Sequence, residues 1–125
     1  GLKIAFIEKG DGPQPQPGDM VQVDYTGYFA DGTMFDTSKE DVAVAAGAFN
    51  QQRKDQSGYN PMVIPYGPEA PVIPGFKEGL QQMKVGDKAV LFIPSHLGYG
   101  ARGAGNVIPP DTDLIFEMEM VGIQE

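Results

Sequence analysis

Apolar and polar residues alternate along several short stretches of the chain, with the period of two that is typical of half-buried β-strands. In the clearest stretch, residues 20–29, Val21, Val23 and Tyr25 alternate with Gln22, Asp24 and Thr26. The turn sequence Asp31-Gly32 follows and predicts a hairpin into a strand at 33–36. Segments 88–94 and 114–123 alternate similarly, 2–7 alternates weakly, and 61–66 has the prolines of an edge strand. The pattern therefore predicts five to six short strands.

Two other segments show helical spacing. Phe76, Leu80 and Met83 recur on one face of a brief helix that ends at 85–87. After residue 38, the apolar residues Val42, Ala45, Ala46 and Phe49 fall at helical spacing, and Ser38 with Asp41 resembles a capping box. We expect one short helix there, weakened by Gly47, then a loop over 50–60. A second loop, rich in glycine and proline, is expected over 95–110.

Many short strands and few helices indicate an α+β fold. We expect a curved antiparallel β-sheet of five to six strands wrapped around one short α-helix, with an inserted short helix after the Phe35-Asp36 strand. The 17 glycines and 11 prolines fit a chain with many turns. A length of 125 residues allows a single domain. Within it, 1–17 would form an N-terminal strand and a proline-rich connection, and 18–125 the main body.

Composition narrows the chemistry that this chain can perform. The absence of cysteine excludes disulfides and thiolate chemistry, and His96 as the only histidine excludes a multi-histidine metal site. A net charge of −8 repels phosphate backbones, so nucleic acid is an unexpected partner. No apolar run reaches the roughly 20 residues that span a bilayer. We expect a soluble protein that is cytoplasmic, or located in the periplasm or cell envelope if a targeting segment preceded Gly1.

The usual catalytic constellations are missing. Asp24, Asp36 and Asp41 lack the spacing of a calcium loop and are better read as solvated or turn-forming carboxylates, so we expect no metal. The adjacent Ser95 and His96 would point apart, and no third group is placed to orient the histidine. The glycine-rich segment 98–103 lacks the Lys-Ser/Thr ending of a phosphate loop, and we expect no cofactor.

Aromatic and branched residues gather beside turns, and most are expected to be core residues. Tyr99 differs, because it lies in a glycine-rich loop without periodicity. An aromatic residue with a hydroxyl in such a loop is more typical of a binding surface than of a core. The sequence therefore predicts a ligand contact at Tyr99.

Five ordered blocks of sequence carry a family resemblance. They are Val23-Asp24-Tyr25-Thr26-Gly27-Tyr28, Asp31-Gly32-Thr33-Met34-Phe35-Asp36-Thr37-Ser38, Val72-Ile73-Pro74-Gly75-Phe76-Lys77-Glu78-Gly79-Leu80, Met83-Lys84-Val85-Gly86, and Tyr99-Gly100 through Val107-Ile108-Pro109-Pro110. Together they resemble the signature blocks of the FKBP-type peptidyl-prolyl cis-trans isomerases. The resemblance implies a curved sheet around a short helix, and isomerisation of X-Pro bonds in peptides or folding proteins without a covalent step.

The resemblance also implies a site. Its catalytic residues would be Tyr99, Asp36, Phe116 and Ile73, with the Tyr99 hydroxyl and the Ile73 N–H donating to ligand carbonyls. Its substrate-binding wall would comprise Tyr25, Phe35, Met62, Val72, Phe76, Val107 and Ile108, with Phe76 as the floor. The partners implied are proline-containing peptides or unfolded proteins, and the macrolide inhibitors of the family. We expect a monomer that needs no cofactor or metal.

Several positions depart from the family pattern. Phe76 stands where tryptophan is common, and Met62 where phenylalanine is frequent. The arginine that often pairs with the Asp36 equivalent has no aligned match, since Asp41 lies there, but Arg53 or Lys54 could substitute from the longer segment 39–60. The loop 101–106 lacks the histidine of some relatives.

Two rival hypotheses accompany the isomerase. The first is a noncatalytic module that keeps the pocket to hold a proline segment or acts as a chaperone-like surface. The second is a hydrolase that uses Asp36 or Ser95, and it suffers from the lack of a suitably placed base.

Overall fold

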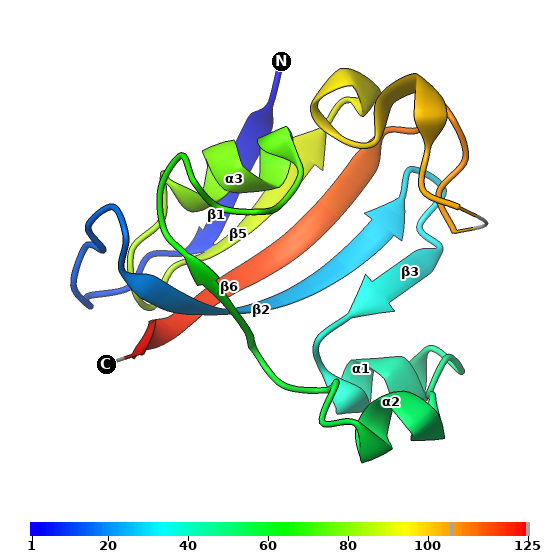
Figure 1. Ribbon diagram of the computed structural model, residues 1–125, viewed down its shortest axis with the longest axis horizontal. Coiled ribbons are helices and arrows are strands. Elements are labelled where there is room, and N and C mark those ends of the chain that lie inside the picture. The colour runs from blue at the N-terminus through cyan, green and yellow to red at the C-terminus, as the bar shows by residue number, and fades with distance from the viewer. Residues whose placement is uncertain (106, 125) are drawn as a thin grey trace.

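The computed structural model describes residues 1–105 and 107–124. Six strands form one antiparallel sheet, and three short α-helices and two 3-10 turns connect them (Figure 1). The strands are β1 (Lys3–Glu8), β2 (Met20–Phe29), β3 (Met34–Thr37), β4 (Met62–Pro65), β5 (Lys88–Ile93) and β6 (Leu114–Gln124). Their order is β1-β5-β6-β2-β3, and β4 also pairs with β2. The predicted α+β class and the antiparallel sheet are confirmed.

Strands β2 and β6 form the centre of the sheet, where they pair along the whole of β2. Val21 and Val23 are fully buried, as the alternation predicts, while Gln22 and Asp24 on the other face are half-buried. The register shifts between Gln22 and Val23 against β6. Such an irregularity bends a strand and increases its twist, which helps to give the sheet its curvature.

Helix α3 (Pro74–Leu80) lies against one face of the sheet (Figure 1). It begins with a proline at its first position, where the missing N–H costs no hydrogen bond. Gly75 and Gly79 fall one turn apart and face β5: a Cβ on Gly79 would lie 2.4 Å from Leu91 Cδ1, and one on Gly75 2.5 Å from Ile93 Cγ2. These glycines let the helix backbone approach the strand closely.

Gly79→Ala should therefore destabilise the protein although alanine favours helices. The added methyl group overpacks the buried Leu91, which outweighs the gain in helix propensity, so we expect a net loss of about 1–2 kcal/mol. Urea unfolding measures it. Glu78→Ala, at an exposed position of the same helix, is the control and should change stability by less than about 0.5 kcal/mol. An unchanged or raised midpoint for Gly79→Ala would contradict this close approach.

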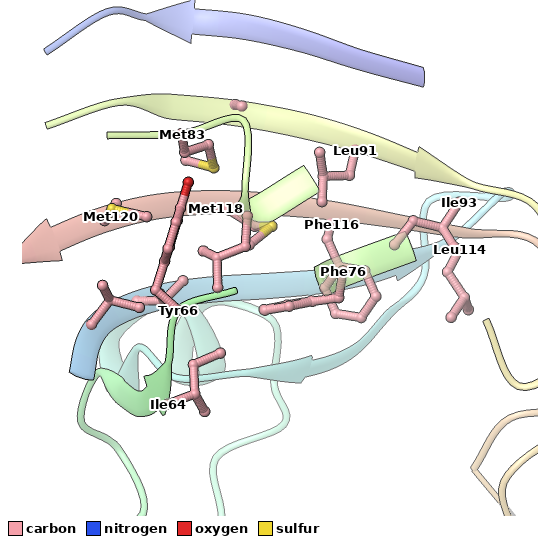
Figure 2. Close-up of a cluster of buried hydrophobic side chains, with 14 of the residues drawn as sticks. Ile64, Tyr66, Phe76, Met83, Leu91, Ile93, Leu114, Phe116, Met118 and Met120 are labelled. Atoms are coloured by element: carbon pink, nitrogen blue, oxygen red, sulfur yellow. The ribbon is translucent and has the colours of Figure 1, made fainter. Parts of the chain in front are cut away.

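One core cluster lies between α3 and the sheet (Figure 2). Phe76 and Leu80 from α3 meet Leu91, Phe116 and other buried side chains of β5 and β6. Tyr66, just after β4, is also buried and donates its hydroxyl hydrogen to the Gln81 carbonyl oxygen at 2.6 Å. The site below is built on the end of this core nearest β3.

Segment 39–60 contains two short helices, α1 (Glu40–Ala45) and α2 (Gln51–Asp55), which lie together beyond β3 (Figure 1). The expectation of one helix followed by a loop over 50–60 was therefore wrong. Asn50 caps α2, because its Oδ1 accepts from the Arg53 N–H at 3.0 Å. An asparagine cap indicates the start of a helix, but the polar composition of 50–60 favoured the prediction of a loop.

The predicted capping box at Ser38 was also wrong. Helix α1 begins after Lys39 and has no side-chain cap, and it ends before Phe49. The Ser38 hydroxyl instead donates to Asp24 Oδ1 at 2.8 Å and accepts from the Tyr25 N–H at 2.9 Å. Ser38 thus joins the end of β3 to the central strand β2 rather than opening the helix.

The predicted loop over 95–110 contains two 3-10 turns, Ser95–Leu97 and Gly100–Arg102. Ala104 then bridges to Ile108, which is 3% exposed and belongs to the core cluster. The loop is thus anchored at Ile108, and Asn106 lies outside the described residues.

Candidate functional site

A cavity of about 490 Å³ opens at the β3 end of the core. It is lined by residues from β2, β3, β4, β6, α3 and the loops before α3 and after β5: Tyr25, Phe35, Asp36, Met62, Pro71, Val72, Ile73, Phe76, Tyr99 and Phe116. Most of these side chains are apolar or aromatic. Such a concave, mainly apolar site with a few polar groups is typical of small-ligand binding.

The aromatic wall of the cavity is packed edge to face. Phe116 lies T-shaped against Phe76, with centroids 5.3 Å apart, and T-shaped against Phe35 at 5.6 Å. Tyr25 lies edge-on to Phe76 at 6.2 Å. Figure 2 shows Phe76 and Phe116 side by side where α3 meets β6. Interlocked rings hold one another in place, so the cavity has a defined shape before any ligand enters.

Gly27 on β2 makes this packing possible. A Cβ at Gly27 would lie 2.5 Å from the Phe35 ring and 2.9 Å from the Phe116 ring. Any larger residue would displace both rings from the cavity wall. The alternation over 20–29 predicted no role for Gly27, although a strand glycine next to aromatic residues is a signal for one.

Two polar groups of the cavity are free to donate among the described residues. The Tyr99 hydroxyl has no hydrogen-bond partner there, and Tyr99 is 39% exposed. The Ile73 N–H lies just before α3 and is likewise unpaired within residues 1–105 and 107–124. Both groups can therefore donate to acceptors of a ligand without breaking a hydrogen bond to any of the described residues.

A chain of hydrogen bonds crosses the edge of the cavity. The Tyr25 hydroxyl donates to Asp36 Oδ2 at 3.0 Å, and Arg53 Nη1 donates to Asp36 Oδ1 at 2.6 Å. The substitution of Arg53 for the missing arginine of the family pattern is thereby confirmed, whereas Lys54 pairs with Glu40 at 3.3 Å. Asp36 is thus held between a phenol and a guanidinium.

This environment keeps both the Tyr25 phenol and the Arg53 guanidinium protonated. Burial raises the pKa of the Tyr25 phenol to about 12, and the negative charge of Asp36 adds to the shift, so the phenol stays protonated near neutral pH. Burial by itself would lower the pKa of Arg53, but the hydrogen bond and charge of Asp36 raise it above its ordinary value. Neither group can act as a base near pH 7.

Nine of the eleven residues that the sequence analysis assigned to the site line this cavity. The other two do not. Val107 is 57% exposed, and Ile108 is buried in the core cluster. Pro71 lines the cavity although no sequence signal singled it out.

Of the residues considered for rival chemistries, Asp36 lines this cavity, whereas Asp24 and Ser95 lie apart from it. Asp24 lines a different hollow of about 170 Å³, with Glu117 and Glu119 on the face of the sheet away from α3. The Ser95 N–H donates to Asp113 at 2.9 Å at the start of a 3-10 turn. Within the described part of the chain, no three His, Asp or Glu side chains are grouped to hold a metal ion. No helix of that part is long and apolar enough to cross a membrane.

Comparisons with known proteins agree with the geometry. Residues 12–121 match the family model described as FKBP-type peptidyl-prolyl cis-trans isomerase. An FK506-binding protein of Neisseria meningitidis is 39% identical over 125 residues, 100% of this chain and 98% of the relative. A probable FKBP-type isomerase, FkpA, of the same species is 36% identical over 98% of this chain, which spans only 38% of that relative.

A solved structure is similar as well. The peptidyl-prolyl cis-trans isomerase of Pseudomonas syringae pv. tomato has a TM-score of 0.74 and 31% identity, covering 99% of this chain and 76% of its own. Sequence family, fold and an apolar, aromatic-walled cavity therefore lead to one assignment: the chain belongs to the FKBP-type peptidyl-prolyl cis-trans isomerase family.

Proposed function

We propose that the cavity between α3, β2 and β6 is where this chain isomerises X-Pro bonds of peptides or folding proteins. The observation that carries the proposal is the enclosure of one hollow by Tyr25, Phe76 and Phe116. The Tyr99 hydroxyl, which is unpaired among the described residues, lies at its rim. A proline ring is compact and apolar, so it suits a cavity with rigid aromatic walls. The flanking peptide then remains at the rim.

Rotation about an X-Pro bond is slow because the twisted amide loses its resonance, a barrier of roughly 18–20 kcal/mol. The planar ground state is the more charge-separated and therefore the better hydrated form. Transfer into an apolar cavity costs the ground state more than it costs the twisted state, which lowers the barrier between them. This route requires no nucleophile and no proton transfer.

The rim supplies orientation. The Ile73 N–H and the Tyr99 hydroxyl are two donors that can hold carbonyl groups on either side of the proline. Asp36, already held by Tyr25 and Arg53, is the acceptor at the edge. Donors and acceptors fixed in advance favour a bent peptide in which the X-Pro bond is twisted.

We infer the ligands from the same features. Proline-containing segments of unfolded or flexible chains would expose the ring that the cavity accepts. A macrolide that presents a ring and carbonyl oxygens to the same donors would compete with them, in keeping with the name of the FK506-binding relative. Single-domain binding of this kind requires no second copy of the chain.

A protease-coupled assay tests the proposal. The chain should accelerate cis-to-trans isomerisation of a Leu-Pro peptide at micromolar concentration, and FK506 should inhibit it. Equal rates with and without the protein would leave only the alternative of a noncatalytic binding module. In that case, titration with the same peptide would still perturb the Tyr99 and Phe76 signals in an NMR spectrum.

The rate should not depend on pH between about 6 and 9. The Tyr25 phenol has a pKa raised to about 12, so it remains a neutral donor to Asp36 throughout this range. The raised pKa of Arg53 keeps the guanidinium charged as well. Measuring kcat/KM across the range, with peptide and protease controls at each pH, checks this. A bell-shaped profile would indicate an ionising catalytic group and contradict the mechanism.

A further inference from the structure

Asp36 is the one charged residue among the described residues that line the cavity. Its side chain is 38% exposed, so it is accessible from the peptide-binding side. The chain as a whole carries a net charge of −8. The Asp36 carboxylate at the edge of the cavity would therefore repel an acidic side chain beside the substrate proline, unless a cation neutralises Asp36.

Arg53 provides that neutralisation from an element outside the cavity. Its Nη1 lies 2.6 Å from Asp36 Oδ1, and its side chain is 31% exposed. It belongs to α2 of segment 39–60, and neither Arg53 nor any other residue of this segment lines the cavity. The charge at the edge of the cavity is thus set jointly by β3 and by the inserted helix.

The position of the guanidinium is built into the insertion. Arg53 Nε donates to the Gly58 carbonyl oxygen at 3.0 Å, and the guanidinium lies 4.8 Å from the centroid of the Tyr59 ring. Tyr59 is itself stacked on Phe49, with centroids 5.8 Å apart. Gly58 must be small here, since a Cβ would lie 2.5 Å from Arg53 Cγ. A long side chain held from several sides keeps its charge at one place.

We propose that Arg53 is a specificity-determining residue, which lets the cavity accept an acidic residue immediately before the proline. With Arg53 present, the edge presents a neutral pair to that residue. Without it, the edge presents the bare Asp36 carboxylate, which repels Glu and attracts Lys. The inference rests on the proposed function, because it requires the proline to bind in the cavity beside Asp36.

The test compares three peptides that differ only in the residue before proline: Glu, Gln and Lys. For Arg53→Gln we expect kcat/KM with Glu-Pro to fall about 3-fold relative to Gln-Pro, a size typical of a partly exposed charge interaction. With Lys-Pro it should rise relative to Gln-Pro. Opposite changes for the two charged peptides cannot result from a merely structural defect, which would lower all three rates together. High salt should reduce both changes.

Lys54→Gln is the matched control. It removes the same charge from the neighbouring position of the same helix, but its partner is Glu40 at 3.3 Å and neither residue lines the cavity. The relative rates for the three peptides should stay unchanged. Arg53→Lys keeps the charge and should restore most of the acceptance of Glu-Pro.

Gly58→Ala covers the case in which Arg53→Gln does not fold. It displaces the arginine while keeping both charges, and it should change the peptide preference in the same direction by a smaller factor. Equal loss on all three peptides, or equal shifts in the Arg53 and Lys54 variants, would overturn the inference while leaving the isomerase intact. An unmodified chain that accelerates none of the peptides would contradict the proposed function itself.

Discussion

Phe116→Ala should lower kcat/KM for X-Pro isomerisation about 10- to 100-fold, because it removes a wall of the cavity and much of the apolar surface that a proline ring would contact. Phe116 is 5% exposed and contacts Phe76, Phe35 and Tyr25. Its loss lets these rings relax and leaves the cavity wider and wetter. The protease-coupled assay measures the rate, and urea unfolding should show a loss of about 3–5 kcal/mol.

Two variants separate the effect on catalysis from the effect on stability. Met120→Ala empties a fully buried position of the same strand that does not line the cavity. It should destabilise the fold while the folded fraction keeps most of its activity. Tyr99→Phe removes only the hydrogen bond that the Tyr99 hydroxyl would donate to the bound peptide, and it should lower kcat/KM less than about 10-fold. A larger effect from Tyr99→Phe than from Phe116→Ala would show that orientation, rather than shape and desolvation, dominates catalysis.

Asp87→Ala should cause a large loss of stability, about 2–4 kcal/mol at neutral pH. The Asp87 side chain is 3% exposed and ties the N-terminal connection to the turn before β5. Its carboxylate accepts from the Gly10 N–H at 2.7 Å, the Lys84 N–H at 3.0 Å and Lys84 Nζ at 3.1 Å. Removing it leaves the half-buried N–H groups of Gly10 and Lys84 without this acceptor. Urea unfolding at pH 7 measures the loss.

The same carboxylate makes this stability depend on pH. Burial alone would raise the pKa of Asp87, but the hydrogen bonds from Lys84 and Gly10 hold the pKa below its ordinary value. A folded-state pKa below the unfolded one stabilises the fold at pH values above the unfolded pKa, and this stabilisation is lost as pH falls through the folded pKa. The difference between the unmodified chain and Asp87→Ala should therefore narrow in acid.

The exposed Asp11 provides the control for this measurement. Asp11→Asn removes an equal charge from the same connection, one residue beyond Gly10, and should change stability by less than about 0.5 kcal/mol. A stability difference for Asp87→Ala that persists unchanged at low pH would indicate lost packing instead of a lost charged acceptor.

Strong local patterns were sufficient for most of the sheet. The alternation over 20–29 predicted β2, because a strand with one buried face must place an apolar residue at every second position. The brief helix at Phe76 and Leu80 followed from its apolar face, but α3 ends at Leu80, before the predicted Met83 and the predicted end at 85–87. The prediction for segment 39–60 was wrong for the same reason, because the method depends on apolar periodicity. Helix α2, capped by Asn50, is polar and has no apolar face. Helix α2 is held in place by contacts of Arg53 with Asp36, Gly58 and Tyr59, and contacts of a single side chain leave no periodic signal.

Residues in loops also lack a periodic pattern from which their burial could be predicted. Val107 and Ile108 are adjacent and both apolar, yet one is exposed and the other is a core residue. The fold of the loop around Ala104 decides which of them points inward. Pro71 similarly reaches the cavity only because the chain before α3 passes beside it.

By itself, the amino-acid sequence determined the strands and the central helix. It also excluded thiol and multi-histidine chemistry, and it supplied the aromatic residues available for a site. These are local or compositional properties, which depend on neighbours a few positions away. Only the tertiary structure decided that Arg53 meets Asp36 across 17 positions of sequence, and that Gly27 leaves room for two rings to close the cavity. Such contacts arise from the path of the chain in space, which short-range patterns do not encode.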